Sequence, residues 1–364
     1  MSIETGAERV ASHPSQRSPR AAAALLGLVL FTTALVIGAA PAGAAAPGTP
    51  RIFGAAGYQS HIRLWFTAPA SNGGSPITKY TISRRMNPLV VGEVPETFDV
   101  TTTGMFTDPT SLTGSAYQYT ITATNADGTS APSDGIYVTQ TVGANDYSKF
   151  PSVGAFVTRQ FQDVLGRAPT ALELSGTTTQ INKGTLSADG FFDQLFADST
   201  RTAHLQVIRL YLAYFKRSPD HGGLAYWTRE IGNGTRDIND VSNAFAGSHE
   251  FKTTYGSLSN IDFVTLVYRN VLGRDPEPNG FAFWTNQLDK HLAIRGRVMT
   301  EFSESSEFKN ASKGRVQAAD VWDALLHANI SAANLDLYST HLDGGGTEGG
   351  LATLIVSLPQ YVVS

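Results

Sequence analysis

Hydrophobic positions follow two different periods along the chain, and the change falls near residue 150. Before it, apolar and polar residues alternate in short runs, most clearly at 62–66, 77–82 and 117–123, which is the period of a half-buried strand. Turn-forming residues fill 70–76 and 125–128, between and after these runs. Several short strands at this spacing predict an antiparallel β-sandwich.

After residue 150 the apolar residues recur at helical spacing. The best example runs from Phe263 to Leu272, where apolar side chains at i, i+1, i+4, i+5, i+8 and i+9 share one helix face. Ser259 supplies a start that resembles a capping box, and Gly273 can take the left-handed conformation that ends a helix. Pro276 prevents continuation. A second helix around Trp284 and a third over 298–308 complete the predicted unit.

This helical unit is repeated. Val-Leu-Gly-Arg occupies 164–167 and 271–274, Phe-Lys-Arg stands at 215–217, and a proline follows two residues after each arginine. An aromatic residue precedes a tryptophan at 226–227 and 283–284, and Phe-x2-Ser ends the units at 196–199, 245–248 and 302–305. Residues 335–361 are a worn copy without the Gly-Arg-x-Pro motif. The pattern predicts an all-α array of about four stacked copies, whose degenerate first and last copies cap its ends.

The first region closely resembles a bacterial fibronectin type III domain. The resemblance rests on Pro50, Trp65, Pro69, the run 72–77, Tyr80 and the pattern Leu-x4-Tyr-x-Tyr-x-Ile-x-Ala-x-Asn at 112–125. It implies an all-β, immunoglobulin-like sandwich in which Trp65 is the buried core tryptophan and Tyr117 takes the tyrosine-corner position. In bacteria such modules are mostly spacers of secreted and surface proteins, and many accompany enzymes that degrade polysaccharides.

The repeats resemble the bacterial domain-of-unknown-function family DUF4214. Its pattern is roughly Tyr/Phe-x2-Val-Leu-Gly-Arg-x-Pro, then Gly-Leu-x-Tyr-Trp, then Phe-x2-Ser-x-Glu-Phe, and the second and third copies match it best. The family occurs in exported and surface-associated proteins and has no established catalytic residues. The resemblance therefore implies a helical repeat region, and it supplies no catalytic residue to carry over to this chain.

These patterns predict four segments: a signal peptide (1–46), a fibronectin type III domain (47–141), a linker (142–152) and the helical repeat region (153–364). Arginines precede the apolar run 21–37, and Ala-Gly-Ala at 42–44 offers small residues to a signal peptidase. Cleavage is the expected outcome, and an uncleaved anchor is the alternative. The chain has no cysteine, so an exported form is held by apolar cores without disulfides.

Charge and motifs exclude several function classes. The formal charge is −4 with no basic block after the N-terminus, which argues against a nucleic-acid partner. No His-Glu-x-x-His, phosphate-binding loop or Gly-x-Ser-x-Gly motif is present. The sequence therefore predicts no cofactor, no metal site and no catalytic residue, and leaves enzymatic activity uncertain but disfavoured. One carboxylate pair, Asp220 and Glu250, stays open for a glycoside hydrolase.

The repeated polar and aromatic residues have structural and functional interpretations. Arg167, Arg217 and Arg274, with Glu250 and Glu307, either hold an anionic ligand or pair with one another where helices meet; pairing is favoured. Trp227 and Trp284 are expected to be core residues, with a sugar-stacking strip as the alternative. Alternating oxygen-bearing residues at 275–279 suggest a calcium loop but fit a helix start better.

A possible ligand surface comes from the differences between the second and third copies. They diverge most in the loop before the second helix and in the segment after it. The cationic side chains in these stretches are His221, Arg236, Lys290, His291 and Arg295. We expect an anionic polymer or acidic protein to bind there with salt-dependent affinity.

The function favoured by the sequence is that of an exported, non-catalytic bacterial protein, secreted or attached to the cell surface. In it, a sandwich spacer presents the helical array for binding or adhesion to cell-wall polysaccharide or an extracellular protein. After signal cleavage no membrane contact is expected. The alternative is an accessory protein of extracellular polysaccharide degradation, and a glycoside hydrolase is the least favoured possibility.

Overall fold

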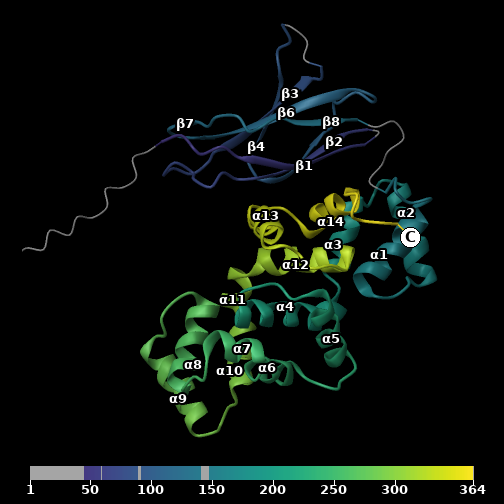
Figure 1. Ribbon diagram of the computed structural model, residues 1–364. Helices are drawn as coiled ribbons and strands as arrows, with labels where there is room; N and C mark the ends of the chain where they lie inside the picture. Colours follow the sequence, from purple (N-terminus) through teal and green to yellow (C-terminus); the bar gives the residue numbers. More distant parts are fainter. Residues whose placement is uncertain (1–44, 59, 89–91, 141–146, 364) are drawn as a thin grey trace, which may run out of the picture. The chain divides into compact units, whose positions relative to one another are not determined.

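The computed structural model describes residues 45–58, 60–88, 92–140 and 147–363 (Figure 1). Most of the predicted signal peptide and residues 142–146 of the predicted linker lie outside these residues. The remaining linker residues fold onto the helical region, because Phe150 is buried and Lys149 Nζ donates to the carbonyl of Leu358 at 2.5 Å. Within the described residues, no helix combines the length and apolarity needed to cross a bilayer.

The N-terminal region is an antiparallel β-sandwich, as the alternating pattern predicts. Its strands are β1 (Arg51–Gly57), β2 (Ile62–Thr67), β3 (Lys79–Met86), β4 (Glu96–Val100), β5 (Gly104–Asp108), β6 (Ala116–Asn125), β7 (Gly128–Thr129) and β8 (Ile136–Thr139). One sheet has the order β1-β2-β5, and the other has β4-β3-β6-β7 with β8 beside β6. In the strand lettering of the fibronectin type III fold, this is an A-B-E sheet against a C′-C-F-G sheet.

The sandwich core consists of the inward-facing residues of β2, β3 and β6. Ile62, Leu64 and Phe66 of β2 meet Ile82 and Ile121 from the other sheet. The tyrosine corner is confirmed, since the backbone N–H of Leu112 donates to the hydroxyl of Tyr117 at 2.8 Å.

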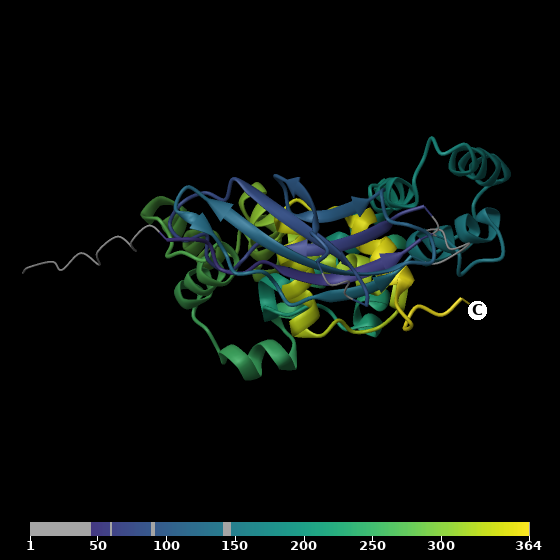
Figure 2. The same ribbon diagram turned by 90° about the horizontal axis from the view of Figure 1, so that it is seen from above.

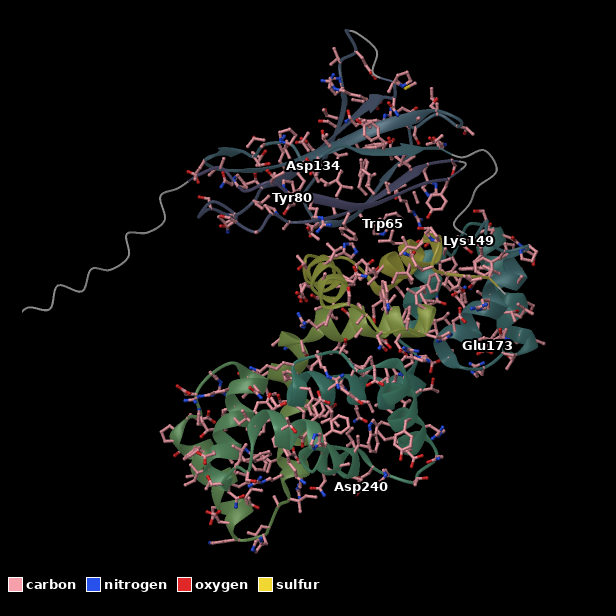
Figure 3. The ribbon with its side chains drawn as sticks, in the orientation of Figure 1. Trp65, Tyr80, Asp134, Lys149, Glu173 and Asp240 are labelled. Carbon is pink, nitrogen blue, oxygen red and sulfur yellow. The ribbon has the colours of Figure 1, made fainter. Side chains whose placement is uncertain are left out.

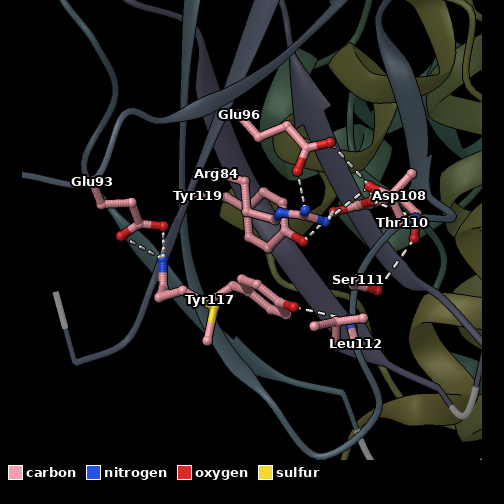
Figure 4. Close-up of polar contacts among 10 residues, drawn as sticks. Arg84, Glu93, Glu96, Asp108, Thr110, Ser111, Leu112, Tyr117 and Tyr119 are labelled. Atoms are coloured by element: carbon pink, nitrogen blue, oxygen red, sulfur yellow. Dashed lines mark hydrogen bonds and ion pairs between the residues drawn. The ribbon is translucent and has the colours of Figure 1, made fainter. Parts of the chain in front are cut away.

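A buried ion pair joins the two sheets (Figure 4). Arg84 Nη1 on β3 donates to Asp108 Oδ2 at the end of β5 at 2.5 Å, and the hydroxyl of Tyr119 donates to the same oxygen at 2.6 Å. Burial alone would raise the pKa of Asp108, but hydrogen bonds from Tyr119, Thr110 and Arg84 outweigh it and hold the pKa below its usual value. The cluster ties the sheets together and therefore has a structural role.

The region after residue 150 is helical, as the 3.6-residue period predicts. Copy 1 contains α1 (Val153–Leu165), α2 (Ala171–Asn182) and α3 (Ala188–Phe196), and a 3₁₀ turn, η1 (Ser199–Arg201), follows. Copy 2 contains α4 (Thr202–Phe215), α5 (His221–Gly232), α6 (Ile238–Ala246) and α7 (His249–Tyr255). Copy 3 contains α8 (Asn260–Val267), the π-helical turn η2 (Tyr268–Leu272), α9 (Pro278–Asp289), α10 (Arg295–Ser303) and α11 (Ser306–Ala311). Copy 4 contains α12 (Lys313–Leu326), α13 (Ala332–Asp343) and α14 (Glu348–Ser357).

The copies do not stack in chain order, so the prediction that copy 4 caps an end of the array is wrong. The third helices pair instead: α3 packs against α14, and α6 packs against α10 (Figure 1). Copies 1 and 4 thus form a first pair, and copies 2 and 3 form a second pair. The first helices connect these pairs, because α12 packs against both α1 and α4. The spatial order of the copies is 1-4-2-3.

Glycine sets the close crossing of the third helices in both pairs. A Cβ on Gly349 would overlap the backbone oxygen of Asp189 in α3, and one on Gly296 would overlap the backbone of Asn243 in α6. Both glycines are the second residue of their helix, and the threonine four residues later bonds back to the glycine carbonyl, Thr353 to Gly349 and Thr300 to Gly296. The two crossings are therefore structurally equivalent.

The sandwich packs against the first pair and is not tethered by the linker alone (Figure 2). Trp65 is fully buried, but it belongs to the helical core, and its Nε1 donates to the carbonyl of Gly350 at 2.9 Å (Figure 3). The expectation that Trp65 lies in the sandwich core is wrong, because successive side chains of β2 point to opposite faces of the sheet. Leu64 and Phe66 face inward, so Trp65 and Arg63 face the helices, where Arg63 Nη2 lies 3.4 Å from Asp189 Oδ1.

Candidate functional site

The repeated arginines form ion pairs with glutamates of the same chain. Arg217 makes two hydrogen bonds to Glu250, at 2.9 and 2.8 Å, and Arg274 bonds to Glu307 and to Glu277, at 3.1 and 2.6 Å. In copy 1, where the glutamate is replaced by Arg201, Arg167 pairs with Glu173 of its own copy. The structure thus shows the pairing arrangement.

The Ser-x-Glu-Phe motif explains how these pairs are positioned. Ser248 and Ser305 cap the short helices α7 and α11 by accepting from the N–H three residues later. This places Glu250 and Glu307 in the first helical turn, next to the arginine at the end of the preceding first helix. The third helix predicted over 298–308 is accordingly broken into α10 and α11.

Both tryptophans of the repeat are half-buried and pack against the aromatic core. Trp227 meets Phe245 edge-to-face with ring centroids 5.7 Å apart, and Trp284 lies 5.9 Å from Phe302. The guanidinium of Arg236 lies 5.9 Å from the centre of the Trp227 ring. This arrangement fits a packing role better than an open sugar platform.

The five residues of the predicted ligand surface do not form one patch. His221 begins α5 and its Nδ1 lies 2.8 Å from Asp323 Oδ1 of α12, whereas Arg236 follows the other end of α5. Arg295 is committed to structure, because its Nη2 donates to the carbonyl of Leu258 at 2.7 Å. Lys290 and His291 are exposed in the turn between α9 and α10.

Exposed apolar side chains accompany Lys290 and His291. Leu292, Ile294 and Ile261 are 60, 53 and 54% exposed. A bond of 2.8 Å between Asn260 Nδ2 and Asp289 Oδ1 holds the start of α8 against this turn. We call this surface of Ile261, Lys290, His291, Leu292 and Ile294 the α9–α10 edge.

Two carboxylates considered for hydrolysis have other partners. Asp220 caps α5 by accepting from the N–H of Gly223 at 2.8 Å, and Glu250 is paired with Arg217. The loop 275–279 is likewise a helix start: Glu277 precedes α9 and pairs with Arg274, while Asp275 pairs with Arg269. Among the described residues, no group of three or more His, Asp or Glu side chains has the geometry of a metal site.

A polar cavity that sequence analysis missed lies where copies 1, 2 and 4 meet. Its volume is about 540 Å³, and α1, η1, α4, α5 and α12 all contribute to its lining. Its polar residues are Asp163, Thr200, Arg201, His204, Thr228, Arg229, Asp323 and His327. A second cavity, of about 650 Å³, continues along α1 and shares Asp163 and His327 with the first. We call the two cavities together the α1 groove.

Ion pairs across the copies form the floor of the groove. Arg201 is bonded to the carbonyl of Val164 and to Asp320, which is fully buried. His204 Nε2 lies 3.1 Å from Asp320 Oδ1. Burial would raise the pKa of Asp320, but Arg201 and His204 lower it overall. These contacts fix copy 4 between copies 1 and 2.

The wall between the two cavities is the contact of His327 with Asp163, whose Nε2 and Oδ1 atoms lie 3.7 Å apart. Hydrogen bonding to Asp163 raises the pKa of His327. His327 ends α12 with φ = 47°, the left-handed position that Gly166, Lys216 and Gly273 occupy in the other copies. Two features of the sequence signal the cavity: this equivalence, and an arginine at position 201 where copies 2 and 3 have glutamate.

The fold and the internal pairs define the class of protein, namely a fibronectin type III-like β-sandwich followed by a helical repeat region. The family model described as "Domain of unknown function (DUF4214)" matches residues 190–253 and 242–312. These residues run from α3 to α11, and copies 2 and 3 are therefore DUF4214 repeats.

The chain spans about a third or less of the titin and twitchin structures that it resembles, and most of a single FNIII domain. A crystal structure of domains from titin has 22% identity and a TM-score of 0.22, covering 27% of this chain and 32% of that chain. The twitchin kinase region from C. elegans has 24% identity and a TM-score of 0.23, covering 28 and 17%. A solution structure of a human FNIII domain has 22% identity and a TM-score of 0.25, covering 33 and 92%. None of the curated proteins matches the sequence.

Proposed function

We propose that the protein is an exported, non-catalytic binding protein that contacts an acidic extracellular protein through the α9–α10 edge. The proposal rests on one observation: some cationic side chains of the repeats are paired inside the chain and others are exposed. The arginines of the repeat motif are paired inside the chain, whereas Lys290 and His291 stand beside exposed aliphatic side chains. Apolar side chains with a cationic rim are a common composition of protein interfaces.

Export to the cell surface or medium rests on the sequence of residues 1–46. An arginine-containing segment, an apolar run and Ala-Gly-Ala are typical of a secretory signal. A fold without cysteine is compatible with that compartment because its domains are held by apolar cores.

A charge-reversal experiment tests the binding surface. Lys290→Glu combined with Leu292→Asp should weaken capture of the partner from culture medium by about tenfold or more at low salt, and the wild-type interaction should weaken as salt rises. Lys183→Glu, an exposed lysine after α2, is the matched control. Equal capture by the double variant and wild type would refute this surface, and retention of anionic cell-wall polysaccharide alone would identify a different partner.

A further inference from the structure

The α1 groove has the size and exposure of a ligand site. Cavities of about 300 to 1,000 Å³ commonly hold small molecules, and its two parts measure about 540 and 650 Å³. The part at the junction is built by helices of three copies. A groove extended along α1 has room for more than one unit of a chain-like ligand.

Its lining is electrically balanced. Arg201, Arg229, Asp163 and Asp323 all line the first cavity, and in the second Arg159 bonds to Asp163 at 2.7 Å. Neutral ligands suit such a lining, because neither cations nor anions find uncompensated charge there. A polyanion fits the α9–α10 edge better than this groove.

The lining also offers donors and acceptors side by side. Thr200, Thr228 and His204 line the first cavity, and Thr158 and Gln162 line the second. Two small residues, Ala225 and Ala324, also line the first cavity and occupy little of its space. Sugar hydroxyls both donate and accept, so they match a mixed lining of this kind.

We infer that the α1 groove binds a neutral oligosaccharide, with the junction cavity holding one sugar unit. Thr228 and Asp323 bond to its hydroxyls, and the Asp163–His327 contact separates this unit from the next one along α1. His221 positions Asp323 from outside the cavity through its 2.8 Å contact. This site is separate from the α9–α10 edge and does not depend on it.

Isothermal titration calorimetry with the purified chain tests the inference. The probes are cellohexaose, maltohexaose and N-acetylchitohexaose, with polygalacturonate as the anionic comparison. We expect at least one neutral hexamer to bind, and its disaccharide to bind about tenfold more weakly because it fills only one cavity. Binding of none of the three hexamers, or of polygalacturonate alone, would overturn the inference.

A matched threonine pair locates the site. Thr228 follows Trp227, and Thr285 follows Trp284 at the equivalent position of copy 3, outside the groove. Thr228→Val should weaken binding of the hexamer by about fivefold, as loss of one hydrogen bond does, whereas Thr285→Val should leave it unchanged. Equal effects of both variants would refute the location.

A third variant separates this proposal from the proposed function. Lys290→Glu with Leu292→Asp should leave sugar binding unchanged. Loss of sugar binding in that variant would place the saccharide on the α9–α10 edge and contradict the groove assignment. Binding of an extracellular protein that Thr228→Val abolishes would contradict it as well, because a protein ligand would then occupy the groove.

Discussion

At the scale of single residues, the arginines and glutamates that recur in the second and third copies have structural roles. Arg217–Glu250 and Arg274–Glu307 were predictable from the sequence, because arginine and glutamate recur at a fixed separation. The pairing of the groove residues was not predictable from the sequence. Arg201 and Asp320 have no equivalent pair in the other copies, and they are 119 positions apart in the chain.

The ion pair inside the sandwich gives a residue-scale prediction. Asp108→Asn should destabilise the sandwich by about 3 to 5 kcal/mol, because Arg84 would remain buried without its counter-charge. Tyr119→Phe should cost about 2 kcal/mol through loss of a hydrogen bond to a charged oxygen. Urea unfolding measures both. Asp99→Asn, which removes the exposed partner of Lys79, is the control and should cost less than about 1 kcal/mol.

His341 gives a second prediction, on pH. His341 is fully buried, and its ring packs edge-on against Phe53 with ring centroids 5.1 Å apart. Burial lowers the pKa of His341 from 6.5 to about 4. The unfolded chain therefore binds a proton more readily than the folded one. The contribution of His341 to the free energy of unfolding is therefore complete above about pH 6.5 and is lost as the pH falls toward 4. It amounts to about 3 kcal/mol.

Unfolding free energies at pH 7.5 and pH 4.5 measure this effect. His341→Leu, which keeps a similar volume, should remove the part of the pH dependence that lies between 6.5 and 4. An unchanged pH profile in the variant would contradict the assignment to His341.

At the scale of helices and strands, local sequence predicted the type of element well. The tyrosine corner of Tyr117, the Ser259 cap and the left-handed Gly273 are all present. The face of Trp65 was mispredicted because a one-residue shift along a strand exchanges its two faces. Apolar residues occupy both faces of β2, so alternation alone left the choice between Trp65 and Leu64 open.

Helix crossings give an element-scale prediction. Gly296→Ala should destabilise the helical region by about 1 to 3 kcal/mol, because its Cβ meets the backbone of α6 and neither helix can yield cheaply. Gly176→Ala in α2 is the matched control, since nothing lies within 4 Å of its added Cβ. It should stabilise by about 0.5 to 1 kcal/mol through higher helix propensity. Thermal or urea unfolding that showed the same sign for both variants would contradict the crossing.

At the scale of the whole molecule, sequence predicted a sandwich followed by a helical region, but not the order of the copies in space. Degeneracy of copies 1 and 4 suggested terminal caps, yet these copies pack on each other, and the sandwich packs on them. Copy 4 lacks the Gly-Arg-x-Pro motif after α12, and its third helix, α14, is almost wholly buried. Non-local pairing of this kind depends on which apolar faces fit together, and the repeat period does not record that fit.

Export gives a prediction for the complete chain. Mass spectrometry of the secreted protein should find an N-terminus close to Ala45, because Ala-Gly-Ala at 42–44 is the predicted cleavage site. Membrane-bound protein with an intact N-terminus would favour the anchor instead.

The pairing of copy 1 with copy 4 and of copy 2 with copy 3 is the central claim, because the α1 groove exists only if copies 1, 2 and 4 meet. Hydrogen exchange of Gly349→Ala and Gly296→Ala tests it most directly. Gly349→Ala should lower amide protection in α14 and in α3, and Gly296→Ala should lower it in α10 and α6. Loss of protection in α10 but not in α3 on Gly349→Ala would instead show copies stacked in chain order and contradict the account.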